Sequence, residues 1–318
     1  MKLDRYQTQG FYDEMFLPDG APREACRPLL DRMTQLGDGE VERRQQAAER
    51  ALLHMGITFN VYGESEGTER IFPLDIVPRI VTAQEWAKLE SGLMQRVYAL
   101  NQFIHDIYHK QKIIQDKVVP EELVKSATSF RPQCMGLNPP RDIWCHITGT
   151  DLVRHSDGQY YVLEDNLRCP SGVSYVLGNR QVMKQTFPQV FGACRVVPVD
   201  DYPSRLLSML QCMARGAADR PVVAVLTPGP YNSAYFEHSY LAQRMGVQLV
   251  EGRDLAVRDG VLCMRTTRGF ERVDVLYRRI DDDFLDPRAF RSDSYLGVPG
   301  LMEVYAAGNV GLANAPGT

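Results

Sequence analysis

The sequence lacks a long apolar run and lacks an excess of positive charge. No stretch approaches the roughly 18 uninterrupted apolar residues of a membrane-spanning helix, and the start, MKLDRYQTQG, has no apolar core of a signal peptide. The chain has 36 Lys and Arg residues against 40 Asp and Glu residues, which gives a formal net charge of -4. Proteins that bind nucleic acids or anionic membranes normally carry basic surfaces. We therefore expect neither nucleic acid nor membrane as a partner.

The sequence also lacks paired cysteines. It has 7 cysteines, an odd number, and they are scattered with no C-x-x-C spacing. A disulfide framework or a zinc knuckle needs regular spacing, so neither is expected. Free thiols persist in a reducing compartment, and the simplest prediction is a cytoplasmic protein.

The length and composition predict a folded protein with more than one domain. The chain has 318 residues, of which 44% are hydrophobic and 24% are charged, and a domain usually takes about 100–200 residues. Changes in periodicity divide the chain into a mainly helical segment, 1–140, a β-rich segment, 141–198, and an α/β segment, 199–318. The expected fold class is α+β or α/β, with a small parallel sheet in the last segment.

The clearest helix signal covers Thr82–His109. Thr82 and Glu85 have the spacing of a capping box, and apolar residues then recur every three or four positions. This periodicity predicts a helix whose apolar face lies in the core. The residues of that face are Trp86, Leu89, Leu93, Val97, Leu100, Ile104 and Ile107. Further helices are predicted at Glu40–Met55, after Pro120, and at Arg205–Arg215.

An early strand is predicted at Ile57–Tyr62, and strand signals dominate from Ile143 onward. Short β segments are predicted there at Trp144–Thr148, Asp151–His155 and Gln159–Asp165. A β-α-β order follows, which indicates a mainly parallel sheet. Its elements are the strand Val222–Leu226, the helix Ala234–Met245, the strands Val247–Val250 and Val273–Tyr277, and a turn at Asp259-Gly260.

Asp157-Gly158 between two β-rich arms predicts a hairpin with a two-residue loop. That register pairs His155 with Tyr160 and Asp151 with Glu164. Side chains alternate between the two faces of a strand, so two carboxylates and one amide converge on one face at the open end of the hairpin. The residues of this face are Asp151, Val153, His155, Tyr160, Val162, Glu164 and Asn166.

This set of oxygen donors suits a hard divalent cation. Carboxylate and amide oxygens are the ligands that Mg²⁺ prefers, and neighbouring carboxylates repel each other unless a cation neutralises them. The residues alone also allow a plain alternative, in which the mouth of the hairpin is a solvent-exposed acidic surface.

Longer strings carry a more specific resemblance. They are F-N-V-Y at 59–62, F-P-L-D-I-V-P-R at 72–79, Q-R-V-Y-A-L-N at 95–101, L-E-D-N-L-R-C-P-S-G-V-S-Y at 163–175, Y-R-R-I-D-D-D-F-L-D-P at 277–287 and G-N-V-G-L-A-N-A at 308–315. With Asp151, these strings resemble the circularly permuted type 2 ATP-grasp proteins, which are similar to glutathionylspermidine synthase. The resemblance runs from about Phe59 to the last residue.

The resemblance implies an ATP-dependent, Mg²⁺-requiring ligase that joins a carboxylate to an amine through an acyl phosphate. Asp151 would bind one Mg²⁺, Glu164 would bridge two, and Asn166 would complete the second. The metals would neutralise charge that develops during phosphoryl transfer, so Glu164 is also counted as catalytic. Arg168 would contact a phosphate of ATP or the acyl phosphate, which makes it both a catalytic and a nucleotide-binding candidate.

The resemblance also implies sites for the substrates, which would be a small-molecule or peptide carboxylate and an amine. The loop at Ser171 and Gly172, with Ser174, would bind a substrate carboxylate. Arg278, Arg279 and Asp281 follow a predicted parallel strand, where α/β folds bind ligands, and Arg suits carboxylates or phosphates. The plain alternatives are an ordinary Pro-Ser-Gly turn and a solvated run of charges.

One departure from the family pattern concerns ATP binding. In permuted members, the nucleotide-binding lysines and a glycine-rich phosphate loop follow the hairpin. This chain has no G-x-x-x-x-G-K, and Lys184 is the only lysine after Asn166. We therefore expect a C-terminal truncation that removes part of the ATP site, with the final residues, 314–318, forming an exposed turn.

Two other functions remain open from the sequence. The chain could be a binding or scaffold protein that keeps the fold without catalysis. Asp151 and Glu164 could also act as the acid and base of a glycosidase, but that function explains neither Asn166 nor the second domain.

Overall fold

The computed structural model describes residues 6–8, 10–37, 39–60, 69–216 and 219–318. Within the described residues, the chain forms two compact units, and each unit is built from separate stretches of sequence. The first unit comprises residues 1–92, 150–164 and 172–200, and the second comprises residues 93–149, 165–171 and 201–318. The division of the sequence into three consecutive segments remains a prediction.

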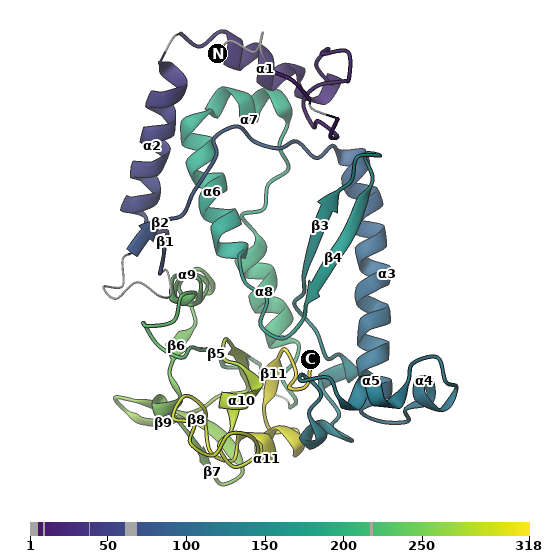
Figure 1. Ribbon diagram of the computed structural model, residues 1–318. Helices are drawn as coiled ribbons and strands as arrows, with labels where there is room; N and C mark the ends of the chain where they lie inside the picture. The colour runs from purple at the N-terminus through teal and green to yellow at the C-terminus, as the bar shows by residue number, and fades with distance from the viewer. Residues whose placement is uncertain (1–5, 9, 38, 61–68, 217–218) are drawn as a thin grey trace. The chain divides into compact units, whose positions relative to one another are not determined.

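The first unit is mainly helical. It holds a 3₁₀ turn (Glu24–Cys26) and the elements α1 (Arg27–Thr34), α2 (Glu40–His54), β1 (Thr58–Asn60), β2 (Glu69–Ile71), α6 (Val173–Thr186) and α7 (Pro188–Cys194). In Figure 1, α2 runs beside α6, and contacts join α2 to α6 and α1 to α7. The helix expected at Glu40–Met55 is thus confirmed. β1 and β2 pair in antiparallel fashion. Of the strand expected at Ile57–Tyr62, the last two residues, 61 and 62, lie outside the described residues.

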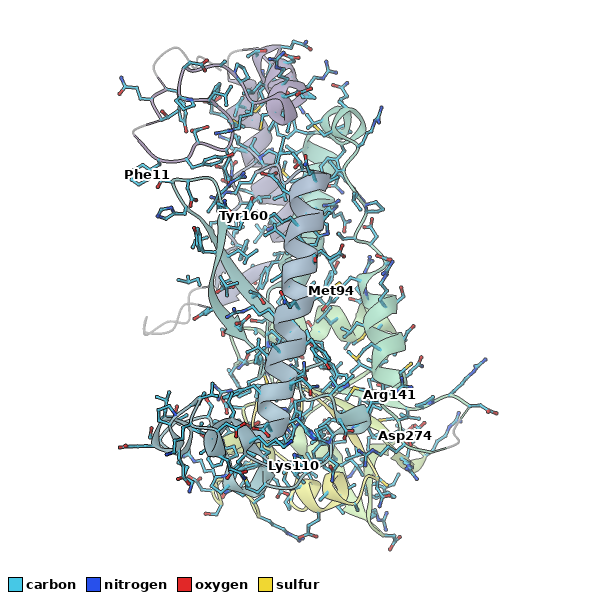
Figure 2. The ribbon with its side chains drawn as sticks, turned by 90° about the vertical axis from the view of Figure 1, so that its right-hand side faces the viewer. Phe11, Met94, Lys110, Arg141, Tyr160 and Asp274 are labelled. Atoms are coloured by element: carbon cyan, nitrogen blue, oxygen red, sulfur yellow. The ribbon has the colours of Figure 1, made fainter. Side chains whose placement is uncertain are left out.

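Two elements pass from one unit into the other. Helix α3 (Ala83–Ile107) confirms the long helix that the periodicity predicts. Its capping box is formed: the Thr82 N–H donates to Glu85 Oε2 at 2.9 Å, and the Glu85 N–H donates to Thr82 Oγ1 at 3.2 Å. The expected core face holds only in part, because Ile104 and Ile107 are buried whereas Trp86 is 53% exposed. Met94, labelled on α3 in Figure 2, is also exposed. The second shared element is the hairpin of β3 (Gly149–Arg154) and β4 (Tyr160–Asn166).

The second unit is built around a parallel sheet. Its helices are α4 (Lys112–Gln115), α5 (Glu121–Lys125), α8 (Tyr202–Gln211), α9 (Tyr235–Met245), α10 (Asp282–Leu285) and α11 (Leu301–Ala306). Its strands are β5 (Val223–Leu226), β6 (Gln248–Val250), β7 (Leu255–Arg258), β8 (Val261–Thr266), β9 (Gly269–Arg272), β10 (Val275–Arg278) and β11 (Gly311–Ala313). Short 3₁₀ turns occur at Pro132–Cys134, Pro140–Asp142 and Gly252–Asp254.

The four-stranded sheet has the order β11-β10-β5-β6, and all three strand pairs are parallel. Every residue of β5, β10 and β11 is buried, as expected for strands of a parallel sheet that is covered on both faces. A separate antiparallel sheet joins β7, β8 and β9, with Asp259 and Gly260 at the β7–β8 turn. The prediction of a mixed fold with a small parallel sheet is therefore confirmed.

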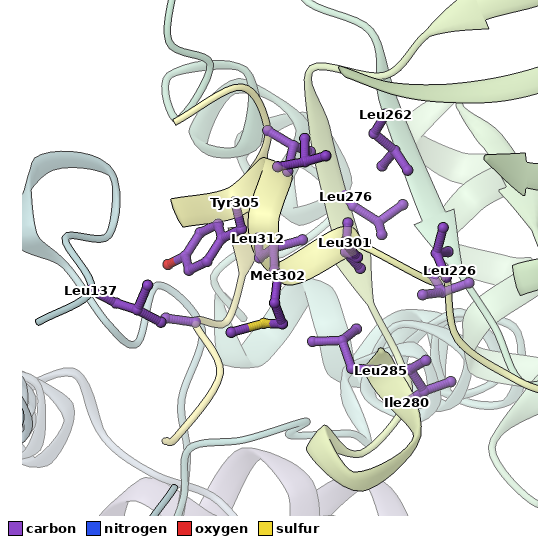
Figure 3. Packing of buried hydrophobic residues seen from close by; sticks show 14 of the residues in the cluster. Leu137, Leu226, Leu262, Leu276, Ile280, Leu285, Leu301, Met302, Tyr305 and Leu312 are labelled. Atoms are coloured by element: carbon purple, nitrogen blue, oxygen red, sulfur yellow. The ribbon is translucent and has the colours of Figure 1, made fainter. Parts of the chain in front are cut away.

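The core of the second unit surrounds this sheet. Figure 3 shows leucines of β5, β10 and β11 packed with residues of α10 and α11, including Leu285, Leu301 and Met302. Tyr305 and Leu137 belong to the same cluster. Burial of each such side chain contributes about 1.5–3 kcal/mol. The core therefore fixes the backbone at the strand ends, where the candidate site residues Arg278, Arg279 and Asp281 lie.

Two expectations for the second unit are wrong. Trp144–Thr148 is not a strand, although Trp144 is fully buried; its side chain packs on Tyr108, with ring centroids 4.9 Å apart. The final residues are not an exposed turn either, because residues 311–317 are buried. The Tyr108 hydroxyl donates to the Gly317 carbonyl at 3.0 Å, and the Gly317 N–H donates to Asp282 Oδ2 at 2.9 Å. The apolar run before Asn314 forms β11, which pairs with β10 at one edge of the sheet, and this pairing draws the residues after it into the core.

Candidate functional site

The β3–β4 hairpin has a longer loop than the sequence predicts. The His155 N–H donates to the Gln159 carbonyl at 2.9 Å, and the Gly158 N–H donates to the His155 carbonyl at 2.8 Å. Gly158 has φ 80°, the left-handed conformation that glycine adopts most readily. This is the pattern of a three-residue loop with a glycine bulge. His155 therefore pairs with Gln159, and the expected pairing of His155 with Tyr160 is wrong.

The one-residue shift changes which side chains share a face. Along β3, Asp151 and Val153 are exposed, whereas Leu152 and Arg154 are half-buried. Along β4, Tyr160 and Val162 fall on the half-buried positions, so they do not share the face of Asp151 as predicted. Arg154 anchors the half-buried face of the hairpin by donating to the Tyr160 hydroxyl at 3.1 Å and to Glu85 Oε1 at 2.5 Å.

The alternation of exposure breaks once in β4, at Leu163 and Glu164, which are both exposed. After this break, Glu164 and Asn166 are exposed and Asp165 is half-buried. Asp151, Glu164 and Asn166 are therefore all exposed, on two strands that pair with each other. Asp151 and Glu164 belong to the first unit, and Asn166 belongs to the second.

The donor set of the hairpin is two carboxylates and one amide, a hard oxygen set that fits Mg²⁺. In the part of the chain that the structure describes, no group of three or more His, Cys, Asp or Glu side chains has an arrangement that could hold a metal ion. The three hairpin residues do not form such a group, because the third of them, Asn166, is an amide.

The residues that follow the hairpin differ in accessibility. Ser171 is exposed, and Gly172, with φ 113°, is the N-cap of α6. Ser174 is fully buried in the first turn of that helix, so its side chain has no surface for a substrate in this structure. Helix α6 was not predicted, because the residues that it buries include polar ones and glycine and so form no apolar stripe in the sequence.

Arg168 forms an ion pair within the second unit. Its Nη1 donates to Asp281 Oδ2 at 2.6 Å, and both side chains remain partly exposed. Burial raises the pKa of the Asp281 carboxyl, but the hydrogen bond and charge of Arg168 outweigh it and hold the pKa below the ordinary value. Arg131 also approaches this region, with its Nη1 2.8 Å from Asp283 Oδ1. The pair fixes Arg168 while leaving part of its guanidinium accessible.

Arg278 and Arg279 lie in a different setting from the one predicted. Arg278 has no exposed side-chain surface; its guanidinium is 2.6 Å from Asp282 Oδ1 and donates to the carbonyls of Asn314, Ile280 and Ala315 at 2.8–3.1 Å. This burial argues against direct contact between Arg278 and a substrate. The charged run from Arg278 to Asp283 is therefore only partly a solvated surface, because Arg278 is buried and supports the fold.

Arg279 is also buried. It donates to the Pro170 carbonyl at 2.6 Å and to Glu237 Oε1 at 2.9 Å, and the Glu237 side chain has no exposed surface. Both arginines lie where β5 and β10 end. The chain leaves β5 toward β6 and leaves β10 toward β11, on opposite sides, which makes this point the topological switch of the sheet.

His238 lies near the same edge and makes folding dependent on pH. Its Nδ1 is 2.9 Å from Thr227 Oγ1, and burial, with the nearby positive charge of Arg279, lowers the pKa of His238 to about 3. Unfolded histidine binds a proton below about pH 6.5. Stability from His238 is therefore complete above that pH and is lost as the pH falls toward the folded-state pKa.

We expect His238 to account for a loss of about 2 kcal/mol in the free energy of unfolding between pH 6.5 and pH 5, at about 1.36 kcal/mol per pH unit. Urea unfolding at the two pH values measures this loss. Between them, the free energy of unfolding of His238→Gln is expected to fall by about 2 kcal/mol less than that of the unmodified protein. His146, whose pKa burial lowers to about 4, acts in the same direction and remains in the variant. An unchanged pH dependence in His238→Gln would contradict this role.

One buried polar residue was missed by sequence reasoning. Asn314 is 2% exposed, and its Oδ1 accepts the N–H groups of His146 and Ile147 at 2.8 and 3.0 Å. Its Nδ2 donates to the carbonyls of Ile147 and Leu167. The sequence signal that could have identified Asn314 is its position as the one amide within the apolar run 310–315.

Comparison with known proteins gives a consistent family. Residues 78–318 match the family model described as circularly permuted ATP-grasp type 2. The chain is 58% identical, over its whole length, to an uncharacterized protein of Synechocystis sp., of which it spans 66%. It is 43% identical over 99% of its length to a Frankia alni protein named "Putative glutamate--cysteine ligase 2-3", of which it spans 36%. The chain thus spans two thirds or less of the length of these relatives.

A solved structure has a similar fold. It is a glutathione synthetase-like effector from Globodera pallida in its apo form, which matches with a TM-score of 0.52 at 12% identity. The match covers 89% of this chain and 63% of the effector. In the described part of the chain, no helix is both long enough and apolar enough to span a membrane.

Proposed function

Because the chain belongs to the circularly permuted ATP-grasp type 2 family, we propose that the protein is an ATP-dependent ligase that joins a carboxylate to an amine. In this reaction, the γ-phosphoryl group of ATP passes to the substrate carboxylate and ADP leaves. The amine then attacks the acyl phosphate, an amide bond forms, and inorganic phosphate is released. The relatives named as ligases support the reaction class.

The observation that carries the proposal is the exposed set of oxygen donors on the hairpin. Asp151, Glu164 and Asn166 are exposed on β3 and β4, and we propose that they bind Mg²⁺. When bound, Mg²⁺ supplies positive charge that neutralises the phosphates of ATP. The two carboxylates supply the negative charge that attracts the cation. The Asn166 amide adds a neutral oxygen, which limits repulsion between ligands.

Arg168 has the second role in the proposal. Its pair with Asp281 orients the guanidinium, and its remaining N–H groups can donate to a phosphate or to the acyl phosphate. A fixed donor stabilises charge that develops in the transition state more than a mobile one does. The exposed loop at Ser171 and Gly172 is proposed to bind the substrate carboxylate. Arg279, buried against the Pro170 carbonyl, supports that loop.

The test measures ADP release by the full-length protein with Mg²⁺, ATP, and a panel of small-molecule or peptide acids and amines. We expect ADP release only when Mg²⁺, an acid and an amine are all present, with the amide as second product. The control omits Mg²⁺ or either substrate. If the protein binds ATP but releases ADP with none of the acid and amine pairs, the result would favour a non-catalytic binding protein and would contradict the proposal.

A further inference from the structure

Asn314 bonds to both chain segments that lead into and out of the hairpin. On one side its side chain bonds to His146 and Ile147, which precede β3, and on the other side to Leu167, which follows β4 directly. All these residues belong to the second unit. One side-chain amide therefore fixes the separation of the two segments at the open end of the hairpin.

The position of Asn314 is itself fixed. It directly follows β11, which pairs in parallel with β10, and its carbonyl accepts a hydrogen bond from Arg278 Nε at 2.8 Å. Arg278 also donates to the next carbonyl, that of Ala315, at 3.0 Å. Because both anchors are buried in the sheet, the Asn314 side chain is a rigid support rather than a mobile contact.

The segments that Asn314 holds are packed closely. A methyl group added at Gly149 would lie 3.2 Å from Pro170 Cβ and 3.6 Å from Asn166 Cβ. Asn166 immediately precedes Leu167, and Arg168 follows it. The backbone between Asn166 and Arg168 is thus held by the Asn314 side chain at Leu167, and Gly149 packs closely against Asn166.

We infer that Asn314 is a positioning residue for the proposed metal and phosphate ligands, and this inference rests on the proposed function. Its side chain is buried and would act through the backbone of Leu167 and Ile147. Loss of a group that orients a metal ligand typically weakens metal binding by about 10–100-fold. Asn314→Ala is therefore expected to raise the dissociation constant of Mn²⁺, bound together with ATP, at least about tenfold.

The experiment measures Mn²⁺ binding by electron paramagnetic resonance in the full-length protein with ATP present. Asn309→Ala is the matched control, because its Nδ2 donates near the surface to the Gly260 carbonyl at 2.9 Å, at the β7–β8 turn, and it should bind Mn²⁺ normally. Asn314→Asp keeps an acceptor for the two N–H groups but loses the bonds donated to the carbonyls of Ile147 and Leu167. Asn314→Asp is expected to weaken Mn²⁺ binding less than Asn314→Ala does. If Asn314→Ala does not fold, Mn²⁺ binding by Asn314→Asp tests the positioning role.

Hydrogen exchange at the Ile147 amide provides a readout that does not depend on metal. Exchange there should accelerate in Asn314→Ala and not in Asn309→Ala. Glu164→Gln separates the two claims. If Glu164→Gln weakens Mn²⁺ binding but folded Asn314 variants bind as the control does, the positioning role is overturned and the proposed function stands. If Glu164→Gln also binds normally, the proposed metal site itself has failed.

Discussion

Glu164→Gln is expected to reduce Mg²⁺-dependent ADP formation by more than about tenfold, because a neutral amide replaces the carboxylate proposed to bridge two metal ions. Glu164 is exposed at the break in alternation of β4, so the isosteric change should leave the fold intact. The loss should fall mainly in kcat, since bridging stabilises charge that develops during phosphoryl transfer. Steady-state rates across a range of Mg²⁺ concentrations measure the effect.

Asp157→Asn is the matched control for this prediction. Asp157 is an exposed carboxylate on the same hairpin, at the loop rather than at the open end, and its Oδ1 accepts the Gln159 N–H at 2.8 Å. An asparagine oxygen can accept the same bond, so activity should stay close to that of the unmodified protein. Equal activities for Glu164→Gln and Asp157→Asn would remove Glu164 from the metal site.

Asp282→Asn is expected to lower the free energy of unfolding by about 3–5 kcal/mol, because it leaves a buried guanidinium without its counter-charge. The side chains of Arg278 and Asp282 are 0% and 1% exposed, and the pair is 2.6 Å long. Asp282 Oδ2 also accepts the Gly317 N–H; the single oxygen of asparagine can face either Arg278 or this N–H, so one of the two contacts is lost. Equilibrium urea unfolding measures the loss.

Glu121→Gln is the control for the ion pair. Glu121 pairs with Lys125 at 2.5 Å within α5, and both side chains are more than half exposed. Exposed pairs of this kind contribute little because water screens them. A loss in Asp282→Asn no larger than that in Glu121→Gln would show that the buried pair does not support the second unit.

Local patterns in the sequence predict the elements of this fold better than they predict its contacts. The capping box at Thr82 sets the start of α3, and the apolar run of β5 identifies a strand of a parallel sheet, because both signals depend on neighbouring residues. Trp86 follows the same periodicity as the core positions and is nevertheless exposed. Periodicity assigns a side chain to a face of a helix, but not to a packing partner.

The hairpin shows the same limit at the candidate site. Asp157-Gly158 marks the turn correctly, yet a three-residue loop shifts the register by one residue, which moves Tyr160 and Val162 off the predicted face. The break at Leu163 and Glu164 returns Glu164 and Asn166 to exposed positions. Neither irregularity is visible in the residue pattern, because a bulge depends on pairing across strands.

Long-range polar contacts were the least predictable feature. The run from Arg278 to Asp283 predicts a ligand-binding site or a charged surface, but Arg278 is buried and donates to the carbonyls of residues 314 and 315. The role of Asn314 likewise depends on segments more than 140 residues away. Such contacts follow from tertiary packing, which residue types and spacing do not specify.

A crystal structure of the full-length protein with ATP and Mn²⁺ tests the metal site most directly, because anomalous scattering locates each Mn²⁺ ion. We predict Mn²⁺ bound by oxygens of Asp151, Glu164 and Asn166 at about 2.0–2.5 Å, in contact with phosphate oxygens of ATP. Nucleotide-bound Mn²⁺ at a site that contains none of these three side chains would contradict this prediction.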